Sequence, residues 1–182
     1  MLGGKLKMYE ALFQKIKSTD FPLQCRGMYY FSKGRHAHQE RKGSGTPYFV
    51  HPRGVALIVM EHGGTVDQIN AALAHDLLED TETSFLEIKA VANSTHCAEL
   101  CAELRNNKFG IAEKGKEDYM TEKLLKMSND ALLIKLADMV YNSWDKPAEK
   151  ALNRMYKNVC ELLLKRNLSS TCKELAELVI LA

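Results

Sequence analysis

The sequence predicts an all-α protein, a bundle of eight to ten helices joined by short loops. Apolar residues recur at helical spacing in every long segment, and capping or helix-breaking residues stand where these segments begin and end. No run of alternating β-branched residues is long enough for a sheet. The 182 residues, 46% of them hydrophobic and 26% charged, fit one globular domain over residues 1–182.

In the first half of the chain, helices are expected over 9–17, 23–38, 52–62 and 66–80. Residues 40–46 read as a loop rich in glycine and basic residues. Pro52 suits the first turn of its helix, where a missing N–H is harmless. Gly63-Gly64 ends that helix, and Thr65 is the expected N-cap of the helix that follows.

In the second half, helices are expected over 84–91, 96–104, 117–127, 131–141, 147–166 and 170–182. The expected N-caps are Thr83 or Ser84, Asn129 or Asp130, and Ser170. Pro147 is expected to open its helix. The polar, glycine-punctuated stretch 105–116 is expected to be the least helical part of the interior.

Composition excludes several classes of protein. A formal net charge of +2, with no basic helix interleaved with aromatic residues, does not indicate a nucleic-acid partner. No window reaches the ~18 consecutive apolar residues of a membrane span, and residues 1–8 do not resemble a secretory signal. The five cysteines are odd in number and scattered, which argues against a disulfide framework. A reducing, cytoplasmic location is therefore expected.

The dipeptide His75-Asp76 lies inside an apolar run, 69–80, that reads as a core helix. Glu79 and Asp80 follow within the same run, so four titratable side chains interrupt it. Burying an unpaired carboxylate costs several kcal/mol, so some partner must offset that cost. A bound cation is the simplest such partner.

A second carboxylate, Asp138, interrupts the apolar helix expected over 131–141. Asn142 lies four residues later and therefore shares its face of the helix. Lys135, three residues before Asp138, offers a pairing that can exist in addition but explains a carboxylate in mid-core less fully.

His51 is a third candidate, because hydrophobic residues flank it and the following Pro52 restricts its backbone. The candidate metal ligands are His51, His75, Asp76 and Asp138. Two imidazoles with two carboxylates suit Mn, Fe, Co, Ni or Zn better than Ca or Mg. A water bound to such an ion becomes a nucleophile near neutral pH.

These residues match the ligand pattern H…HD…D of the HD-domain metal-dependent phosphohydrolases. Three segments resemble, more narrowly, the hydrolase domains of Rel/SpoT-type alarmone enzymes. They are Arg41-Lys42…Gly45-Thr46-Pro47-Tyr48-Phe49-Val50-His51-Pro52, the segment from Ala71 to Thr81, and the segment from Ile134 to Asn142. All three occur in the family's order, and the resemblance covers about 25–165.

The resemblance implies an all-α HD fold, one divalent ion, usually Mn²⁺, and hydrolysis of the 3′-pyrophosphate of the nucleotide (p)ppGpp. In that family the residues matching Glu79 and Asp80 assist catalysis. Those matching the Arg41-Lys42 pair and Asn142 bind the nucleotide. From the residues alone, either Glu79 or Asp80 could accept a proton from metal-bound water. Arg41 suits a purine face or a phosphate, and Lys42 acts as a point charge.

The chain departs from the family in three ways. One extra residue follows the Arg-Lys pair before Gly45, so either Arg41 or Lys42 could hold the family's position. Residues 105–116 match poorly, which leaves the substrate open, and no synthetase domain follows, so a small stand-alone hydrolase is expected. The alternatives are an HD hydrolase of another phosphorylated nucleotide and a non-catalytic nucleotide-binding protein.

Overall fold

The computed structural model describes residues 21–42, 44–145 and 149–181, so the helix expected over 9–17 and the role of Pro147 lie outside it. The elements, in chain order, are η1 (Leu23–Cys25), α2 (Arg26–Arg35), α3 (Val50–Glu61), α4 (Val66–Ala74), α5 (Leu77–Asp80), α6 (Phe85–Ala92), α7 (Thr95–Leu104), α8 (Lys108–Lys114), α9 (Lys116–Lys126), α10 (Asn129–Asp145), α11 (Lys150–Leu163) and α12 (Ser170–Leu181).

The all-α prediction is confirmed. Nine of these α-helices have eight or more residues, within the predicted eight to ten, while α5 and α8 are shorter. The described ranges contain no β-strand, and the isolated bridge between Glu40 and Pro47 closes the loop before α3. Across those same ranges, no helix combines the length and apolar character that a bilayer crossing requires.

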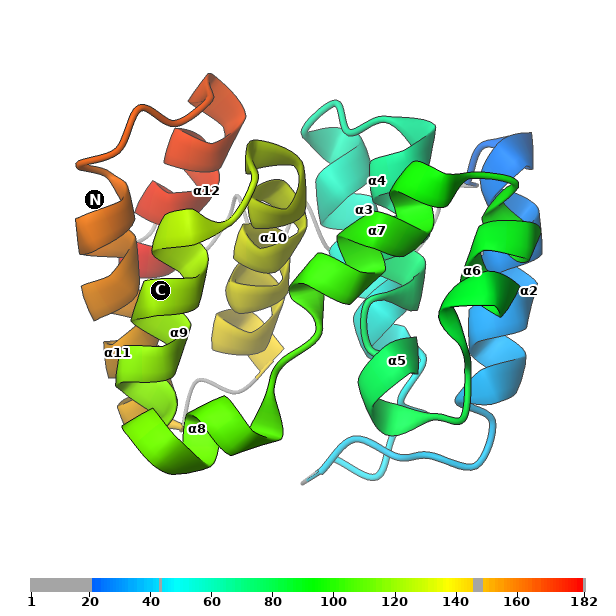
Figure 1. Cartoon of the computed structure of the whole chain (residues 1–182), viewed down its shortest axis with the longest axis horizontal. Helices are drawn as coiled ribbons and strands as arrows, with labels where there is room; N and C mark the ends of the chain where they lie inside the picture. The colour runs from blue at the N-terminus through cyan, green and yellow to red at the C-terminus, as the bar shows by residue number, and fades with distance from the viewer. Residues whose placement is uncertain (1–20, 43, 146–148, 182) are drawn as a thin grey trace.

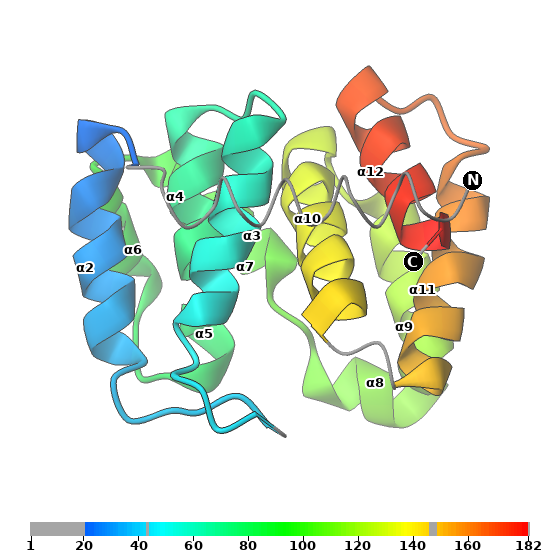
Figure 2. The same ribbon diagram turned by 180° about the vertical axis from the view of Figure 1, so that it is seen from behind.

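Helix α10 lies in the middle of the molecule (Figure 1), with α3, α4 and α7 on one side and α9, α11 and α12 on the other. The view from behind shows α3 and α10 side by side (Figure 2). Apolar residues cover most of α10, and Leu132, Ile134 and Leu136 are fully buried. A buried central helix is therefore the frame on which the other helices pack.

Helices α3 and α10 approach each other closely at Gly54. A Cβ built on Gly54 would lie 2.0 Å from Cε2 of Tyr141, which is far inside van der Waals contact. Only a residue without a side chain fits there, because protein interiors are close-packed. His51 precedes Gly54 by three residues and Asp138 precedes Tyr141 by three, so this contact also sets how close these two side chains come.

The helix expected to run without interruption to Asp80 is broken in the structure. Helix α4 ends at Ala74, and α5 begins at Leu77 after a turn formed by His75-Asp76. The ring Nδ1 of His75 lies 2.8 Å from the carbonyl oxygen of Ala72. In a continuous helix that oxygen would accept the N–H of Asp76, so the imidazole takes the place of a helical hydrogen bond.

Helix starts follow the predicted capping chemistry at some positions and differ at others. The expected N-cap Thr65 is confirmed, and of Thr83 and Ser84 it is Ser84 that caps α6; both caps form capping boxes. Ser128 Oγ accepts the N–H of Ala131, so Ser128, not Asn129 or Asp130, caps α10. Similarly, Ser169 Oγ accepts the N–H of Cys172, so the cap of α12 lies one residue before Ser170.

The stretch 105–116 is more helical than expected, because it contains α8. Asn107 caps α8, with its side-chain oxygen accepting the N–H of Phe109 at 3.0 Å and of Gly110 at 3.3 Å. Gly115, with φ +81°, separates α8 from α9. The glycine is therefore a helix terminator and not a sign of irregular structure.

Candidate metal centre

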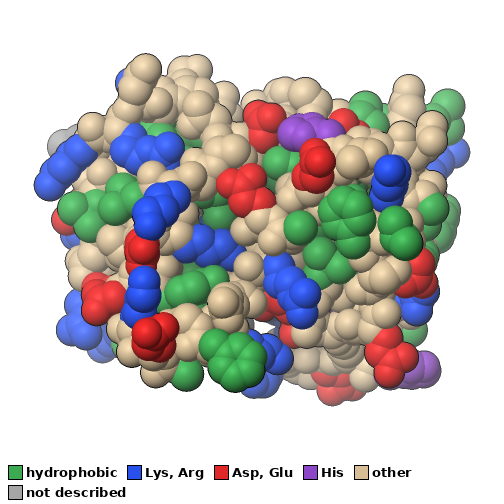
Figure 3. Space-filling view, in the orientation of Figure 1, with side chains coloured by type: hydrophobic (Ala, Val, Ile, Leu, Met, Phe, Trp, Pro, Cys, Tyr) green, Lys and Arg blue, Asp and Glu red, His purple; other side chains and the backbone are tan. Residues whose placement is uncertain are grey.

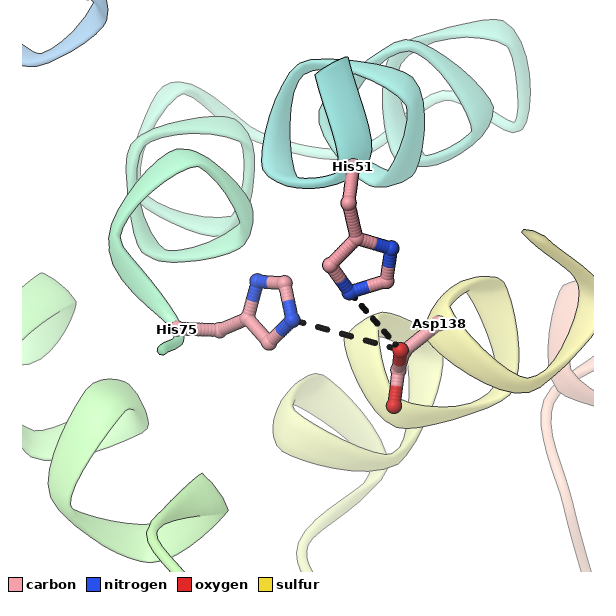
Figure 4. Close-up of side chains that lie close together, drawn as sticks. All are labelled: His51, His75 and Asp138. Carbon is pink, nitrogen blue, oxygen red and sulfur yellow. Dashed lines mark ion pairs between the residues drawn. The ribbon is translucent and has the colours of Figure 1, made fainter. Parts of the chain in front are cut away.

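Three buried side chains converge (Figure 4): His51 from the start of α3, His75 from the turn that follows α4 and Asp138 from the middle of α10. Oδ1 of Asp138 lies 3.2 Å from Nε2 of His51 and 4.0 Å from Nε2 of His75. One donor atom from each residue lies within 4.8 Å of the others, a spacing that a metal ion could bridge. Metal–nitrogen and metal–oxygen bonds of roughly 2.0–2.2 Å fit inside such a triangle.

Asp76 lies beside this triangle. Its Oδ2 is 3.5 Å from Nε2 of His51 and 3.3 Å from Nε2 of His75. Asp76 is the more exposed of the two carboxylates, with 19% of its side chain accessible against 6% for Asp138. The four side chains selected as ligands from the sequence are thus close together, and Asp76 lies on the solvent side.

The hydrogen bond from His75 to Ala72 fixes the tautomer of this ring. A carbonyl oxygen accepts, so Nδ1 carries a hydrogen, and in the neutral ring Nε2 then presents its lone pair. Nε2 is buried and has no hydrogen-bond partner in the described part of the chain. A buried acceptor without a donor is costly, and a cation would satisfy it.

The charge states of the other ligands also fit a cation. Burial lowers the pKa of His51, so the ring is held in the neutral form that binds metals. Burial opposes ionisation of Asp76, but the imidazoles of His75 and His51 outweigh it and lower the Asp76 pKa. A neutral imidazole beside an ionised carboxylate is a donor pair suited to a divalent first-row ion.

Asp138 is also held by two side chains of its own helix, Lys135 and Asn142. Its Oδ2 accepts a hydrogen bond from Lys135 Nζ at 2.7 Å, so the pairing considered from the sequence exists alongside the other contacts. Burial opposes the charge, yet Lys135 holds the pKa of Asp138 well below its usual range. Asn142 Nδ2 donates to Oδ1 at 2.6 Å. These contacts fix the orientation of the carboxylate toward the two histidines.

The structure separates the two candidate catalytic acids. Asp80 Oδ2 lies 3.4 Å from the hydroxyl of Tyr48, which also donates to Oδ2 of Asp76 at 2.6 Å. Partial burial, followed by the charges of Asp76 and Glu79, raises the pKa of Asp80. The one hydrogen of the Tyr48 hydroxyl goes to Asp76, and Asp80 lies beside the same hydroxyl, so Asp80 is the candidate acid that adjoins the candidate metal centre.

Glu79 faces the connection between α7 and α8 instead. Its Oε1 accepts the backbone N–H of Asn106 at 2.5 Å, and its Oε2 lies 3.4 Å from Asn106 Nδ2. A cavity of about 410 Å³ lies beside it, lined by Glu79, Ala102, Arg105, Asn106, Asn107, Lys108 and Phe109. The face drawn in Figure 3 is hollowed between the two halves of the molecule, and basic side chains border the hollow.

The predicted substrate-binding residues differ in their surroundings. Arg41 is buried and forms an ion pair with Asp145, and its Nη2 donates to Oδ1 of Asn142 at 3.1 Å. Asn142 in turn contacts Asp138, so Arg41 is connected to the metal centre. Lys42 is exposed. Both basic residues line a cavity of about 520 Å³ with Gln39, Glu40, Tyr48 and Asp80.

Three contributors were missed from the sequence: Tyr48, Asn106 and Asp145. Tyr48 was part of a recognised motif but carried no assigned role, although burial raises its pKa and keeps its hydroxyl a donor. Asp145 is 104 residues from Arg41 in the chain. Asn106 acts partly through its backbone N–H, for which no side-chain pattern exists.

Comparison with known proteins identifies relatives of this chain. A family model described as HD domain matches residues 29–156. A solved structure described as "A metazoan ortholog of SpoT hydrolyzes ppGpp and plays a role in starvation responses" superposes with a TM-score of 0.73 and 23% identity, covering 89% of this chain and 96% of that chain. At that identity, the match shows that the fold is shared.

Similar sequences include the zebrafish (Danio rerio) guanosine-3′,5′-bis(diphosphate) 3′-pyrophosphohydrolase MESH1, 37% identical over 118 residues, with 63% of this chain and 64% of that protein covered. The Aquifex aeolicus guanosine-3′,5′-bis(diphosphate) 3′-pyrophosphohydrolase is 37% identical over 123 residues. That alignment covers 63% of this chain and 16% of the bacterial protein. This chain therefore spans less than two thirds of either relative. The resemblance proposed from the sequence motifs is confirmed.

Proposed function

Because this chain belongs to the HD domain family, we propose that it is a metal-dependent pyrophosphohydrolase that acts on (p)ppGpp. Water would cleave the bond between the 3′ oxygen of the ribose and phosphorus, releasing pyrophosphate and GDP or GTP. Curated relatives at 37% identity are named for this reaction, which supports the assignment. A small nucleotide substrate and a cytoplasmic location belong to the same proposal.

One observation carries the proposal: the buried cluster of His51, His75 and Asp138 is linked through Asp76 and Tyr48 to a cavity that contains Arg41 and Lys42. The cluster supplies a metal site, and Arg41 and Lys42 supply positive charge for phosphate groups. A structural metal site would have no need for a neighbouring cavity of about 520 Å³ that also contains an acid, Asp80. This combination is typical of a hydrolytic site.

We assign the ion, with Mn²⁺ as the expected metal, to His51, His75, Asp76 and Asp138. When bound, a divalent ion would acidify a water molecule and polarise a phosphoryl oxygen. The buried Nε2 of His75, which has no hydrogen-bond partner in the described part of the chain, and the ionised Asp138 suit such an ion.

The other tasks, which are accepting a proton and orienting the attacking water, fall to protein side chains. Asp80 accepts the proton of the attacking water, because its raised pKa makes it a better base than an ordinary aspartate. The hydroxyl of Tyr48 donates to the candidate ligand Asp76 and lies 3.4 Å from Asp80, so the two carboxylates share this neighbour. Glu79, kept in one orientation by Asn106, accepts a hydrogen bond from the same water and orients it.

The nucleotide is bound by the basic pair and Asn142. Lys42 is exposed at the cavity and contacts phosphate as a point charge. Arg41 is anchored by Asp145 and by Asn142, so it offers a guanidinium of fixed orientation to the purine or to a phosphate. Anchoring favours binding, because less side-chain entropy is lost when the ligand arrives.

The direct test is product analysis by chromatography after incubation of the purified chain with ppGpp and Mn²⁺. We expect GDP and pyrophosphate, no reaction after metal removal, and no reaction by the Asp76→Ala variant. If the chain hydrolyses other phosphorylated nucleotides but not ppGpp, the alternative of an HD hydrolase of another phosphorylated nucleotide would be favoured. Tight nucleotide binding without turnover would favour a sensor and would reject the enzymatic assignment.

A further inference from the structure

We propose that Lys123 of α9 is a positioning residue for the hydrolytic reaction, because it holds Asn106 where Asn106 can orient the carboxylate of Glu79. The proposal rests on the function assigned above to Glu79. Lys123 belongs to none of the three sequence motifs and does not contact the candidate metal ligands.

The contacts of Lys123 lie on the end of α7. Its Nζ donates to the carbonyl oxygens of Leu104 and Arg105, each at 2.7 Å, and lies 3.3 Å from Oδ1 of Asn106. An ammonium group has three hydrogens, so these three oxygens match all of its donors. The last carbonyls of a helix are favourable partners for a cation, because they form the negative end of the helix dipole.

A second residue of α9 holds the same segment. Tyr119, one helical turn before Lys123, accepts the backbone N–H of Asn107 at 2.7 Å through its hydroxyl oxygen. Residues four apart share one face of a helix, so α9 presents Tyr119 and Lys123 together to the chain at 104–107. Two side chains on one face thus fix four consecutive residues.

Asn106 carries this restraint to Glu79. While Lys123 binds the side-chain oxygen of Asn106, the backbone N–H and Nδ2 of Asn106 face the two oxygens of Glu79. Glu79 itself has several rotatable bonds, and within the described residues its carboxylate hydrogen-bonds to Asn106, so its orientation depends on these contacts. Loss of Lys123 would free the segment and allow the carboxylate to rotate.

The charged groups around Lys123 also support its role as a positioning residue. Lys123 is partly buried, in contrast to the exposed Lys126 of the same helix. The charged groups that act on Lys123 are Lys135 from α10, Glu79 from α5 and Glu103 from α7. An ammonium group placed near Lys135 is unfavourable in itself, and its hydrogen bonds to the 104–106 segment offset that cost.

The test compares Lys123→Met with Lys126→Met, an exposed lysine of α9 whose charge pairs with Glu122. We expect Lys123→Met to lower kcat by about 10-fold to 100-fold, with KM and metal content unchanged. Lys126→Met should behave like the parent chain, and Lys123→Arg should recover most of the activity. Tyr119→Phe, which removes one hydrogen bond of the same group, serves as a milder second variant.

A double-mutant cycle shows whether Lys123 acts through Glu79. In the Glu79→Gln background, Lys123→Met should cause little further loss, because the orientation of the carboxylate no longer matters. An equal loss in both backgrounds, or an unchanged kcat in Lys123→Met, would overturn the proposal.

Hydrogen exchange of the Asn106 amide separates this inference from the proposed function. Exchange should accelerate in Lys123→Met and not in Lys126→Met, whether or not ppGpp proves to be the substrate. Unchanged protection of that amide would refute the positioning role even in an active enzyme. Absence of ppGpp turnover by the parent chain would refute the function alone.

Discussion

The metal centre and the segment 104–126 are held in place in different ways. His51, His75 and Asp138 are buried between core helices, and Asp138 is fixed by three separate side chains. The segment 104–126 is more exposed, and among the described residues its hydrogen bonds to Glu79 come from Asn106. Damage to the metal centre should therefore abolish activity outright, whereas damage to the segment should reduce it by degrees.

The largest effect is expected at the metal centre. Asp138→Ala should remove metal binding and turnover together, and should also lower the free energy of unfolding by about 3–5 kcal/mol, because it leaves the charge of Lys135 buried without its partner. Elemental analysis and thermal unfolding measure the two effects. A variant that keeps stoichiometric metal would contradict the assignment of Asp138.

The next effect is expected one turn away, at Asp80. Asp80→Asn should lower kcat by about 10²-fold to 10⁴-fold while metal content stays unchanged, because the proton acceptor is lost but the ligands remain. Glu79→Gln should cost less, since Glu79 orients the water and does not take the proton. Steady-state kinetics on metal-loaded protein measures which of the two variants loses more of its kcat. If Glu79→Gln proves the more damaged variant, the two roles must be exchanged.

A smaller effect is expected in the cavity that contains the basic pair. Lys42→Ala should raise KM by about 10-fold with kcat little changed, because an exposed charge-assisted contact to phosphate is lost. Arg41→Ala should in addition lower the melting temperature, since Asp145 and Asn142 lose their partner. A kcat effect without a KM effect in Lys42→Ala would place Lys42 in the chemical step.

The smallest expected effect is a change of kcat with pH, which arises from Lys123 in the segment 104–126. Burial, and then Lys135, lowers the pKa of Lys123 to about 8 from an ordinary 10.5. Above about pH 8 the amine has one donor fewer and no charge, so kcat should fall there. Lys123→Arg, which stays charged, should not show that decline.

The free energy of unfolding should change with pH in the direction opposite to kcat. Between about pH 8 and the ordinary value of 10.5, the unfolded chain binds the proton of Lys123 and the folded chain does not. The contribution of Lys123 to the free energy of unfolding must therefore rise with pH in this window. Denaturant titrations of the parent chain and of Lys123→Met across the window measure the difference.

Local patterns were sufficient to predict the fold class and to select the four candidate ligands. Asp76 and Asp138 were identifiable because a carboxylate inside an apolar helix is costly, and that cost is visible in the sequence itself. The cap at Thr65 was likewise a local feature. In each of these predicted features, the interacting groups are close in the sequence or lie on one hydrophobic face of a helix.

Other features depended on contacts between distant segments. The break at His75 arises from competition between an imidazole and a backbone N–H for one carbonyl oxygen, which periodicity does not reveal. The partner of Arg41 lies on the far end of α10, and Lys123 binds backbone oxygens that every residue type possesses. Such contacts become visible only when the helices are placed in space.

The close contact at Gly54 has a consequence for how the ion is bound. Because α3 meets the ring of Tyr141 with no methyl group between them, apolar packing sets the separation of His51 and Asp138. An ion bound there would not have to draw two helices together, and its binding energy would not be consumed in deforming the protein. A glycine outside the set of candidate ligands would thus contribute to the tightness of metal binding.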